Sequence, residues 1–132
     1  MLIPCVWLAA CQATPPEAPD WAGFLDQVDR MDAQQLQLAR AAAMRQYSAQ
    51  PTDANRLRAG YLLSRPEASQ EQLAQSRELL AEIAADGELA PMRGLLDAEI
   101  RRAMELQAQL NALKAIEEEM VESQQQADEM DP

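Results

Sequence analysis

The C-terminal third of the chain contains almost none of the residues that interrupt a helix. Between Pro91 and Pro132 there is no other proline, and the only glycine is Gly94. Proline breaks a helix because it lacks the backbone N–H and clashes with the preceding turn, and glycine weakens a helix through its larger entropic cost. We therefore expect one long helix, with Pro91 in its first turn, that runs to about residue 122.

Apolar residues in this stretch recur with a seven-residue repeat. The repeat consists of Leu96, Ala103, Leu106, Leu110, Leu113 and Met120, and Glu117 interrupts it. Such a repeat places the side chains in one stripe and gives the helix coiled-coil character. Two arrangements remain open, because the helix can project as a rod or fold its stripe back onto a core. The expected partner-binding side chains are Leu106, Leu110, Leu113 and Ile116.

The composition extends the helical prediction to the rest of the chain. The sequence has four glycines, one Phe and hardly any runs of Val, Ile or Thr, which disfavours strands. Pro51 and Pro66 divide the region before the long helix into short segments. We predict an all-α fold of short antiparallel helical hairpins with tetratricopeptide-like stacking, followed by the long C-terminal helix. The regular period of tetratricopeptide repeats is absent.

Capping residues set the expected boundaries of the shorter helices. The expected N-terminal caps are Asp20, Thr52 or Asp53, and Ser69 with Gln72 in a capping box. A further helix is expected over about 33–48, and Gly87 is expected to end the helix that Ser69 begins. The helical domain is thus predicted to span 20–122.

The chain opens with an apolar run that ends at a cysteine. The run at 2–10 is far shorter than the roughly 20 residues that span a bilayer, but its length is typical of the apolar part of a signal peptide. The last residues of the run and the cysteine are Leu8, Ala9, Ala10 and Cys11, which resemble a bacterial lipobox. The resemblance implies that 1–10 is a signal peptide and that Cys11 carries the lipid. No basic residue precedes Arg30, so we interpret the signal peptide as truncated.

The segment at 11–19 is rich in proline and is expected to form an extended tether behind the lipidated cysteine. By the same resemblance, Gln12 after the cysteine implies sorting to the outer membrane. Several acyl chains give stable anchoring where one gives marginal binding. Two alternatives remain open: Cys11 stands by chance in a frayed terminus, or Cys5 and Cys11 form a disulfide.

The chain is strongly acidic, with a net charge of -11 and no His. This charge disfavours nucleic acid and anionic lipid surfaces as partners, because both require clustered Lys and Arg. The acidic residues near the C-terminus are Glu117, Glu118, Glu119, Glu122, Asp128, Glu129 and Asp131. We expect 123–132 to be a disordered acidic tail. It would act as a solvating tail or dock onto a basic surface of a partner.

Few residues support catalysis. Without His, the chain lacks the commonest general base and metal ligand, and it has no Gly-rich phosphate loop. Its one lysine, Lys114, is expected on a helix surface, and carboxylates such as Asp97 and Glu99 are interpreted as solvated. We therefore expect a non-enzymatic protein without a metal site, and with no cofactor other than the covalent lipid at Cys11.

Longer motifs give a family resemblance. In order, the chain has the lipobox cysteine, "RLRAGYLLSRPEAS" at 56–69, "SRELLAEIAAD" at 76–86 and "LNALKAIEEEM" at 110–120. Together these resemble the QseG/YfhG family, small outer-membrane lipoproteins associated with a two-component system of gammaproteobacteria. The chain departs from the family after Glu117, where family members typically have a basic residue and this chain has Glu118.

The resemblance implies a periplasm-facing lipoprotein that binds the sensor domain of a histidine kinase and modulates two-component signalling. We expect the stripe of the last helix to make this contact. One alternative is a tetratricopeptide-like scaffold lipoprotein for envelope assembly, which would bind partners near Tyr47, Arg56 and Tyr61. The other alternative is a coiled-coil spacer that forms a homodimer through the last helix.

Overall fold

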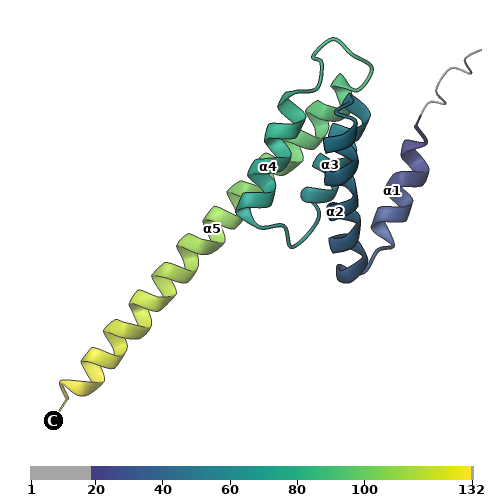
Figure 1. Cartoon of the computed structure of the whole chain (residues 1–132). Coiled ribbons are helices and arrows are strands. Elements are labelled where there is room, and N and C mark those ends of the chain that lie inside the picture. The colour runs from purple at the N-terminus through teal and green to yellow at the C-terminus, as the bar shows by residue number, and fades with distance from the viewer. Residues whose placement is uncertain (1–18, 132) are drawn as a thin grey trace, which may run out of the picture.

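The computed structural model describes residues 19–131, which form five helices. They are α1 (Trp21–Asp29), α2 (Ala33–Ala49), α3 (Asp53–Leu63), α4 (Gln70–Ala81) and α5 (Ala90–Glu129). No strand occurs in this range, which confirms the all-α prediction. Helix α2 packs on α3, α3 on α4, and α4 on the first part of α5, as stacked hairpins (Figure 1).

Side-chain caps begin four of the five helices. The capping residues are Asp20, Asp32, Thr52 and Ser69, and the last three precede α2, α3 and α4. Each accepts a hydrogen bond from a backbone N–H that the helix itself leaves without a partner. The caps at Asp20 and Ser69 confirm the prediction, and Thr52 rather than Asp53 caps α3.

Two apolar clusters hold the body together. The buried members of the first are Val28, Ala43, Ala59, Leu62, Leu63 and Leu79. The buried members of the second, which joins α3 and α4 to α5, are Leu57, Leu73, Leu80, Ile83, Leu96 and Ile100. Tyr61 packs against both clusters and so connects α1 and α2 with the rest of the body.

Helices α3 and α4 approach each other closely at Gly60. The buried hydroxyl of Ser76 donates a hydrogen bond of 2.6 Å to the Gly60 carbonyl oxygen. A Cβ atom added at Gly60 would lie 3.0 Å from Cδ2 of Leu80. A residue without a side chain therefore sets the distance between the two helices, and the hydrogen bond satisfies the buried hydroxyl.

Helix α4 is shorter than predicted, and the prediction that Gly87 ends it is wrong. The helix ends at Ala81, and turns follow it. The side chain of Ile83 is buried in the second apolar cluster. Its carbonyl oxygen accepts a hydrogen bond of 2.7 Å from Nη1 of Arg93. Because these contacts hold Ile83 against α5, tertiary packing ends the helix before the glycine is reached.

Helix α5 continues past the predicted boundary of the helical domain. It extends to Glu129, so the segment at 123–129, which we predicted to be disordered, is helical. This segment consists mainly of Gln, Ala and Glu, which are good helix formers, and no proline occurs between Pro91 and Pro132. An acidic residue near a helix C-terminus is unfavourable by only about 0.3–1 kcal/mol when exposed. The helix propensity of this segment therefore outweighs the unfavourable effect of its acidic residues at the helix C-terminus.

The distal half of α5 projects from the body as a rod (Figure 1). Leu96 and Ile100 in its first part are buried, whereas every residue from 108 to 131 is exposed. The helix has 40 residues, which corresponds to a length of about 60 Å. Of the two arrangements that the repeat leaves open, the structure adopts the rod.

Candidate functional site

The proposed lipid attachment site lies outside the described residues. Cys11 and the lipobox residues Leu8, Ala9 and Ala10 all precede residue 19, where the description begins. The structure therefore leaves the lipobox as a prediction from the sequence. A group on Cys11 would be linked through 12–18 to the residues that precede α1.

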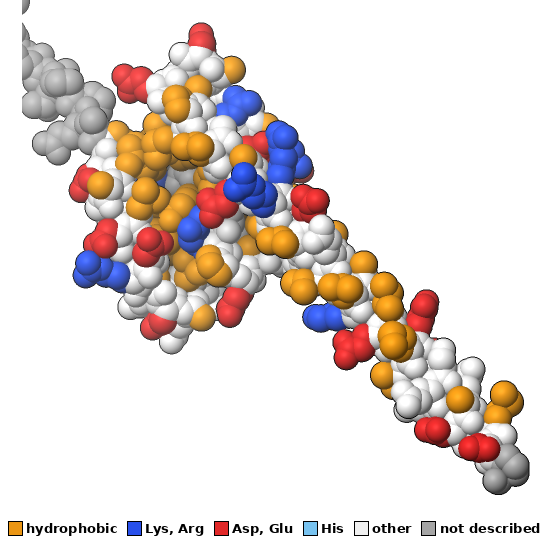
Figure 2. Space-filling view, turned by 180° about the vertical axis from the view of Figure 1, so that it is seen from behind, with side chains coloured by type: hydrophobic (Ala, Val, Ile, Leu, Met, Phe, Trp, Pro, Cys, Tyr) orange, Lys and Arg blue, Asp and Glu red, His pale blue; other side chains and the backbone are white. Residues whose placement is uncertain are grey.

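The predicted partner-binding residues form one exposed stripe on the distal half of α5. Leu106, Leu110, Leu113 and Ile116 are 60%, 57%, 62% and 53% exposed, and Met120 on the same side is 67% exposed. We call these five residues the α5 stripe. Hydrophobic side chains along the rod are visible in Figure 2. Large apolar side chains exposed together on one side of a helix typically mark an interaction surface.

A second apolar feature, which we call the apolar hollow, lies beside the first turns of α5. It has a volume of about 160 Å³, and its walls include Trp21, Phe24 and Leu25 of α1, Tyr61 of α3, and Met92 and Leu95 of α5. Figure 2 shows a hollow in the body with hydrophobic side chains around it. Leu95 remains 75% exposed in this position. The hollow is therefore an apolar cavity that opens at the molecular surface.

The apolar hollow and the α5 stripe share one face of α5. Leu95 lies eleven positions before Leu106 in the sequence, which is close to three full turns of a helix with 3.6 residues per turn. The two side chains therefore point in nearly the same direction from the helix axis. Glu99 also lines the hollow, and Glu99 and Arg102 are charged residues between these two apolar positions on that face. A helical partner that lay on the stripe would thus be directed toward the hollow.

Ion pairs fix the position of α5 on α4. Asp97 accepts from Nε of Arg77 at 3.1 Å and pairs with Nη2 of Arg101 at 2.6 Å. Partial burial raises the pKa of the Asp97 carboxyl, but the hydrogen bonds and charges of the two arginines outweigh it and hold that pKa below its ordinary value. The interpretation of Asp97 as a solvated carboxylate is therefore wrong, because it bridges two helices.

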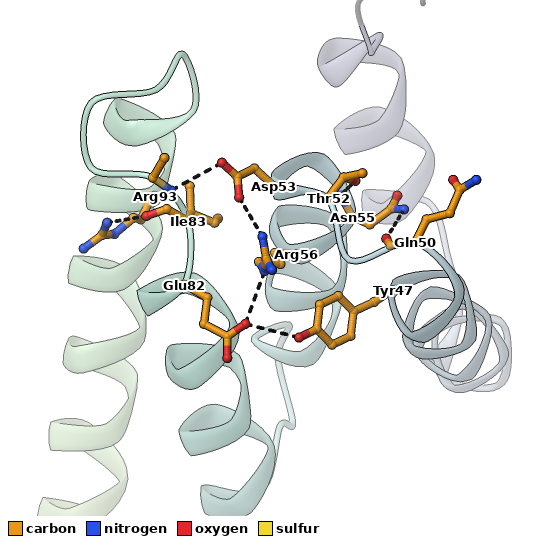
Figure 3. A network of polar contacts seen from close by, with 10 residues as sticks. Tyr47, Gln50, Thr52, Asp53, Asn55, Arg56, Glu82, Ile83 and Arg93 are labelled. Carbon is orange, nitrogen blue, oxygen red and sulfur yellow. Dashed lines mark hydrogen bonds and ion pairs between the residues drawn. The ribbon is translucent and has the colours of Figure 1, made fainter.

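The residues of the alternative scaffold site are engaged within the molecule (Figure 3). The hydroxyl of Tyr47 donates to Glu82 at 3.3 Å, and Arg56 binds both Glu82 at 3.3 Å and Asp53 at 2.8 Å. Asp53 also accepts from the backbone N–H of Ala84 at 3.3 Å. Burial lowers the pKa of Arg56, and the hydrogen bonds to Asp53 and Tyr47 with the charge of Glu82 raise it more. This network connects α2, α3 and the turn after α4.

Tyr61, the third residue of the alternative site, lies on the wall of the apolar hollow. Its ring centroid is 5.7 Å from that of Phe24, and Cζ of Arg65 lies 3.6 Å from the centroid. Burial raises the pKa of the Tyr61 hydroxyl, the charge of Arg65 opposes this, and Asp29 raises it further. The hydroxyl is therefore protonated at neutral pH and donates to Asp29 at 3.4 Å.

Residues 19–131 contain neither a candidate metal site nor a candidate membrane-spanning helix. No group of three or more His, Cys, Asp or Glu side chains in this range could hold a metal ion. In the same range, no helix is both long and apolar enough to cross a membrane.

Sequence reasoning missed three exposed apolar residues of α5. Leu95, Val121 and Met130 are 75%, 51% and 83% exposed. Val121 follows Met120 directly and borders the stripe, and a heptad count with flanking positions included would have found it. The exposure of Leu95 depends on the hollow that α1 and α3 leave beside α5, which is a tertiary feature without a local signal.

Comparisons of the chain with protein-family models, with curated proteins and with solved structures found no match.

Proposed function

We propose that this chain is a non-enzymatic envelope lipoprotein that binds another protein through the α5 stripe. The observation that carries the proposal is that five large apolar side chains lie exposed on one side of a projecting helix. A partner helix can pack on such a stripe with its own apolar residues, as amphipathic helices do in peptide grooves and coiled coils. A lipid on Cys11 would hold the rod near a membrane and raise the local concentration of membrane-bound partners.

The partner we propose is the periplasmic sensor domain of a histidine kinase, as the resemblance to the QseG/YfhG family implies. Binding would modulate signalling if the α5 stripe had different affinity for the signalling states of the kinase. The outer-membrane location and the lipid anchor are parts of the same proposal. They depend on the lipobox residues Leu8, Ala9, Ala10 and Cys11.

Metabolic labelling with a palmitate analogue tests the anchor. The full chain would be expressed behind the basic N-terminal part of a lipoprotein signal sequence joined at Met1, as wild type and as Cys11→Ser. We expect label in the wild type and none in the variant. Cys5→Ser, made in the full chain preceded by the same signal sequence, is the matched control and should keep the label. A wild type without label would contradict the anchor.

Co-purification with the purified sensor domain tests the partner. Leu110→Gln with Leu113→Gln removes two apolar side chains from the stripe and keeps residues that favour a helix. We expect this double variant to lose at least about 90% of the bound sensor domain, because central apolar contacts dominate most interfaces. Leu38→Gln is the matched control, since Leu38 is 66% exposed on α2, away from the stripe. Equal capture by all three proteins would contradict the proposal.

A scaffold lipoprotein for envelope assembly is the second candidate, and the position of Tyr61 on the wall of the apolar hollow favours it. In that case the partner would bind at the hollow. Tyr61→Ala would then abolish co-purification of an assembly partner, and the double variant of the α5 stripe would retain it.

A further inference from the structure

We propose that a second copy of this chain pairs with α5 in antiparallel orientation, so that each copy covers the α5 stripe of the other. The last turn of each α5 would then reach the apolar hollow of the opposite copy. The proposal concerns the same surface as the proposed function, but it requires neither the lipid nor a kinase.

The charge along α5 determines the orientation. The segment at 117–122 holds four glutamates, Glu117, Glu118, Glu119 and Glu122. A parallel pair in register would place these glutamates against their counterparts and Glu117 against Glu117 within the apolar seam, where like charges repel. An antiparallel pair separates them by bringing 117–122 of one copy to 101–106 of the other. That segment contains two arginines, Arg101 and Arg102, and one glutamate, Glu105, so its net charge is positive.

The apolar residues support one register of the antiparallel pair. The seam of a coiled coil has two alternating positions, called a and d. In an antiparallel pair, an a position of one helix faces a d position of the other. Leu110 would then lie against Leu113 of the second copy, and Ala103 against Met120 of the second copy. Glu117 would lie across from Leu106, one turn from Arg102 of the opposite copy. The interrupting glutamate thereby gains a basic neighbour in place of a like charge.

The same register brings the end of the second copy to the apolar hollow. Met130, which is 83% exposed, would lie across from Arg93, next to Met92 and Leu95 on the wall of the hollow. The hollow holds about 160 Å³, which suits single side chains rather than a whole helix of about 10 Å diameter. The exposed methionine of one copy and the exposed hollow of the other therefore fit each other.

The area that this pairing covers is sufficient for a specific dimer. In this register the exposed distal half of each α5 lies along the opposite α5, and its end reaches the first turns of that helix, where Leu96 and Ile100 face the body. The overlap covers the five residues of the stripe together with Val121, Leu95 and Met130, each more than half exposed. With the residues that flank them, this approaches the roughly 800 Å² per partner of a standard interface. The antiparallel helices also place their macrodipoles in opposite directions, which is favourable.

Light scattering coupled to size exclusion tests the pairing. The full chain with Cys5→Ser and Cys11→Ser, which has no other cysteine, would be measured from about 1 to 200 µM, a range that includes the micromolar affinities of modest interfaces. We expect a dimer at the upper end. Leu113→Glu should raise the dissociation constant at least about 50-fold, because it buries a charge in the seam. Leu38→Glu places the same charge on α2 and should leave the dimer intact.

Disulfide formation between two single-cysteine variants tests the orientation. Ala103→Cys and Met120→Cys, each in the cysteine-free background, would be mixed and oxidised. The antiparallel register predicts a mixed dimer of the two variants, whereas a parallel pair predicts disulfides between identical variants. Disulfides between two Met120→Cys chains would overturn the orientation. A monomer at every concentration, with the helix content of α5 intact by circular dichroism, would overturn the pairing itself.

Failure of this proposal and failure of the proposed function give different results. A wild type that is monomeric at every concentration can still capture the sensor domain, and a wild type that dimerises can still fail to capture it. If both proposals hold, partner and second copy compete for the α5 stripe. Addition of the sensor domain would then reduce the fraction of dimer.

Discussion

Two glycines in helices stand in opposite environments. A Cβ added at Gly60 would lie 3.0 Å from Leu80 Cδ2, whereas a Cβ added at Gly94 would have no atom within 4 Å. We predict that Gly94→Ala raises the free energy of unfolding by about 0.5–1 kcal/mol, because alanine favours a helix and nothing obstructs its methyl group. Gly60→Val should lower it by about 1–3 kcal/mol through overpacking between α3 and α4. Urea denaturation at one fixed protein concentration would measure both.

The control for this pair is the slope of the urea transition, which should remain the same in both variants if only stability changes. A Gly60→Val protein as stable as the wild type would show that α3 and α4 have room to separate. Among single residues, Gly60 therefore reports on helix packing and Gly94 on helix propensity.

At the level of the element, Asp97 couples the α4–α5 contact to pH. Its pKa in the folded protein lies below the roughly 3.9 of an unfolded chain, because Arg77 and Arg101 stabilise the carboxylate. The ionised group therefore stabilises the fold above about pH 4, and this contribution is lost as the pH falls through the folded-state pKa. We predict that Asp97→Asn lowers the free energy of unfolding at pH 7 by about 0.5–1 kcal/mol, a modest value because both arginines are partly exposed.

Denaturation curves at pH 7 and near pH 2.5 would measure this effect. The difference between wild type and Asp97→Asn should shrink at the acidic pH, because the stabilisation by the ionised carboxyl decreases as the pH falls below the pKa of the unfolded chain. Glu105→Gln, on an exposed residue of the same helix, should show a smaller difference at both pH values. An Asp97→Asn deficit that persisted unchanged in acid would argue against the ion pairs as its cause.

The end of α5 gives a second prediction for an element. Ser123→Pro removes a backbone N–H inside the helix and clashes with the preceding turn. We expect the helical signal at 222 nm to fall by about 5–10%, which corresponds to the loss of the helix from about this residue onward. Ser123→Ala should leave the signal unchanged or raise it slightly. If 123–129 were disordered in solution, both variants would give the wild-type signal.

The sequence predicts the helices well where their ends are determined locally. Asp20 and Ser69 were identified as caps from their own sequence neighbours, and Pro91 was expected in the first turn of the long helix. The end of α4 was missed because Ile83 is held by the second apolar cluster and by Arg93, which come together only in the folded chain. The end of α5 was missed because acidic charge was weighted above helix propensity.

At the scale of the whole molecule, the α5 stripe was predicted residue by residue, but whether it projects or folds back onto the body was left open. An apolar stripe has the same pattern whether it packs on its own body or on another chain. Whether the stripe packs on its own body or stays exposed depends on how much apolar surface the body offers. Here Leu96 and Ile100 fill the second cluster, and the body ends before Leu106 is reached.

The projecting helix predicts an elongated molecule in solution. A compact chain of 132 residues has a radius of gyration of about 14 Å. We expect small-angle X-ray scattering to give a value several ångströms larger for Leu113→Glu, the variant designed to remain monomeric, because the distal half of α5, about 30 Å long, extends from one side of the body. The wild type at high concentration should be longer still, since antiparallel pairing places the two bodies at opposite ends of a shared rod. A monomer near 14 Å would mean that α5 folds back in solution, which would remove the exposed stripe that both proposals require.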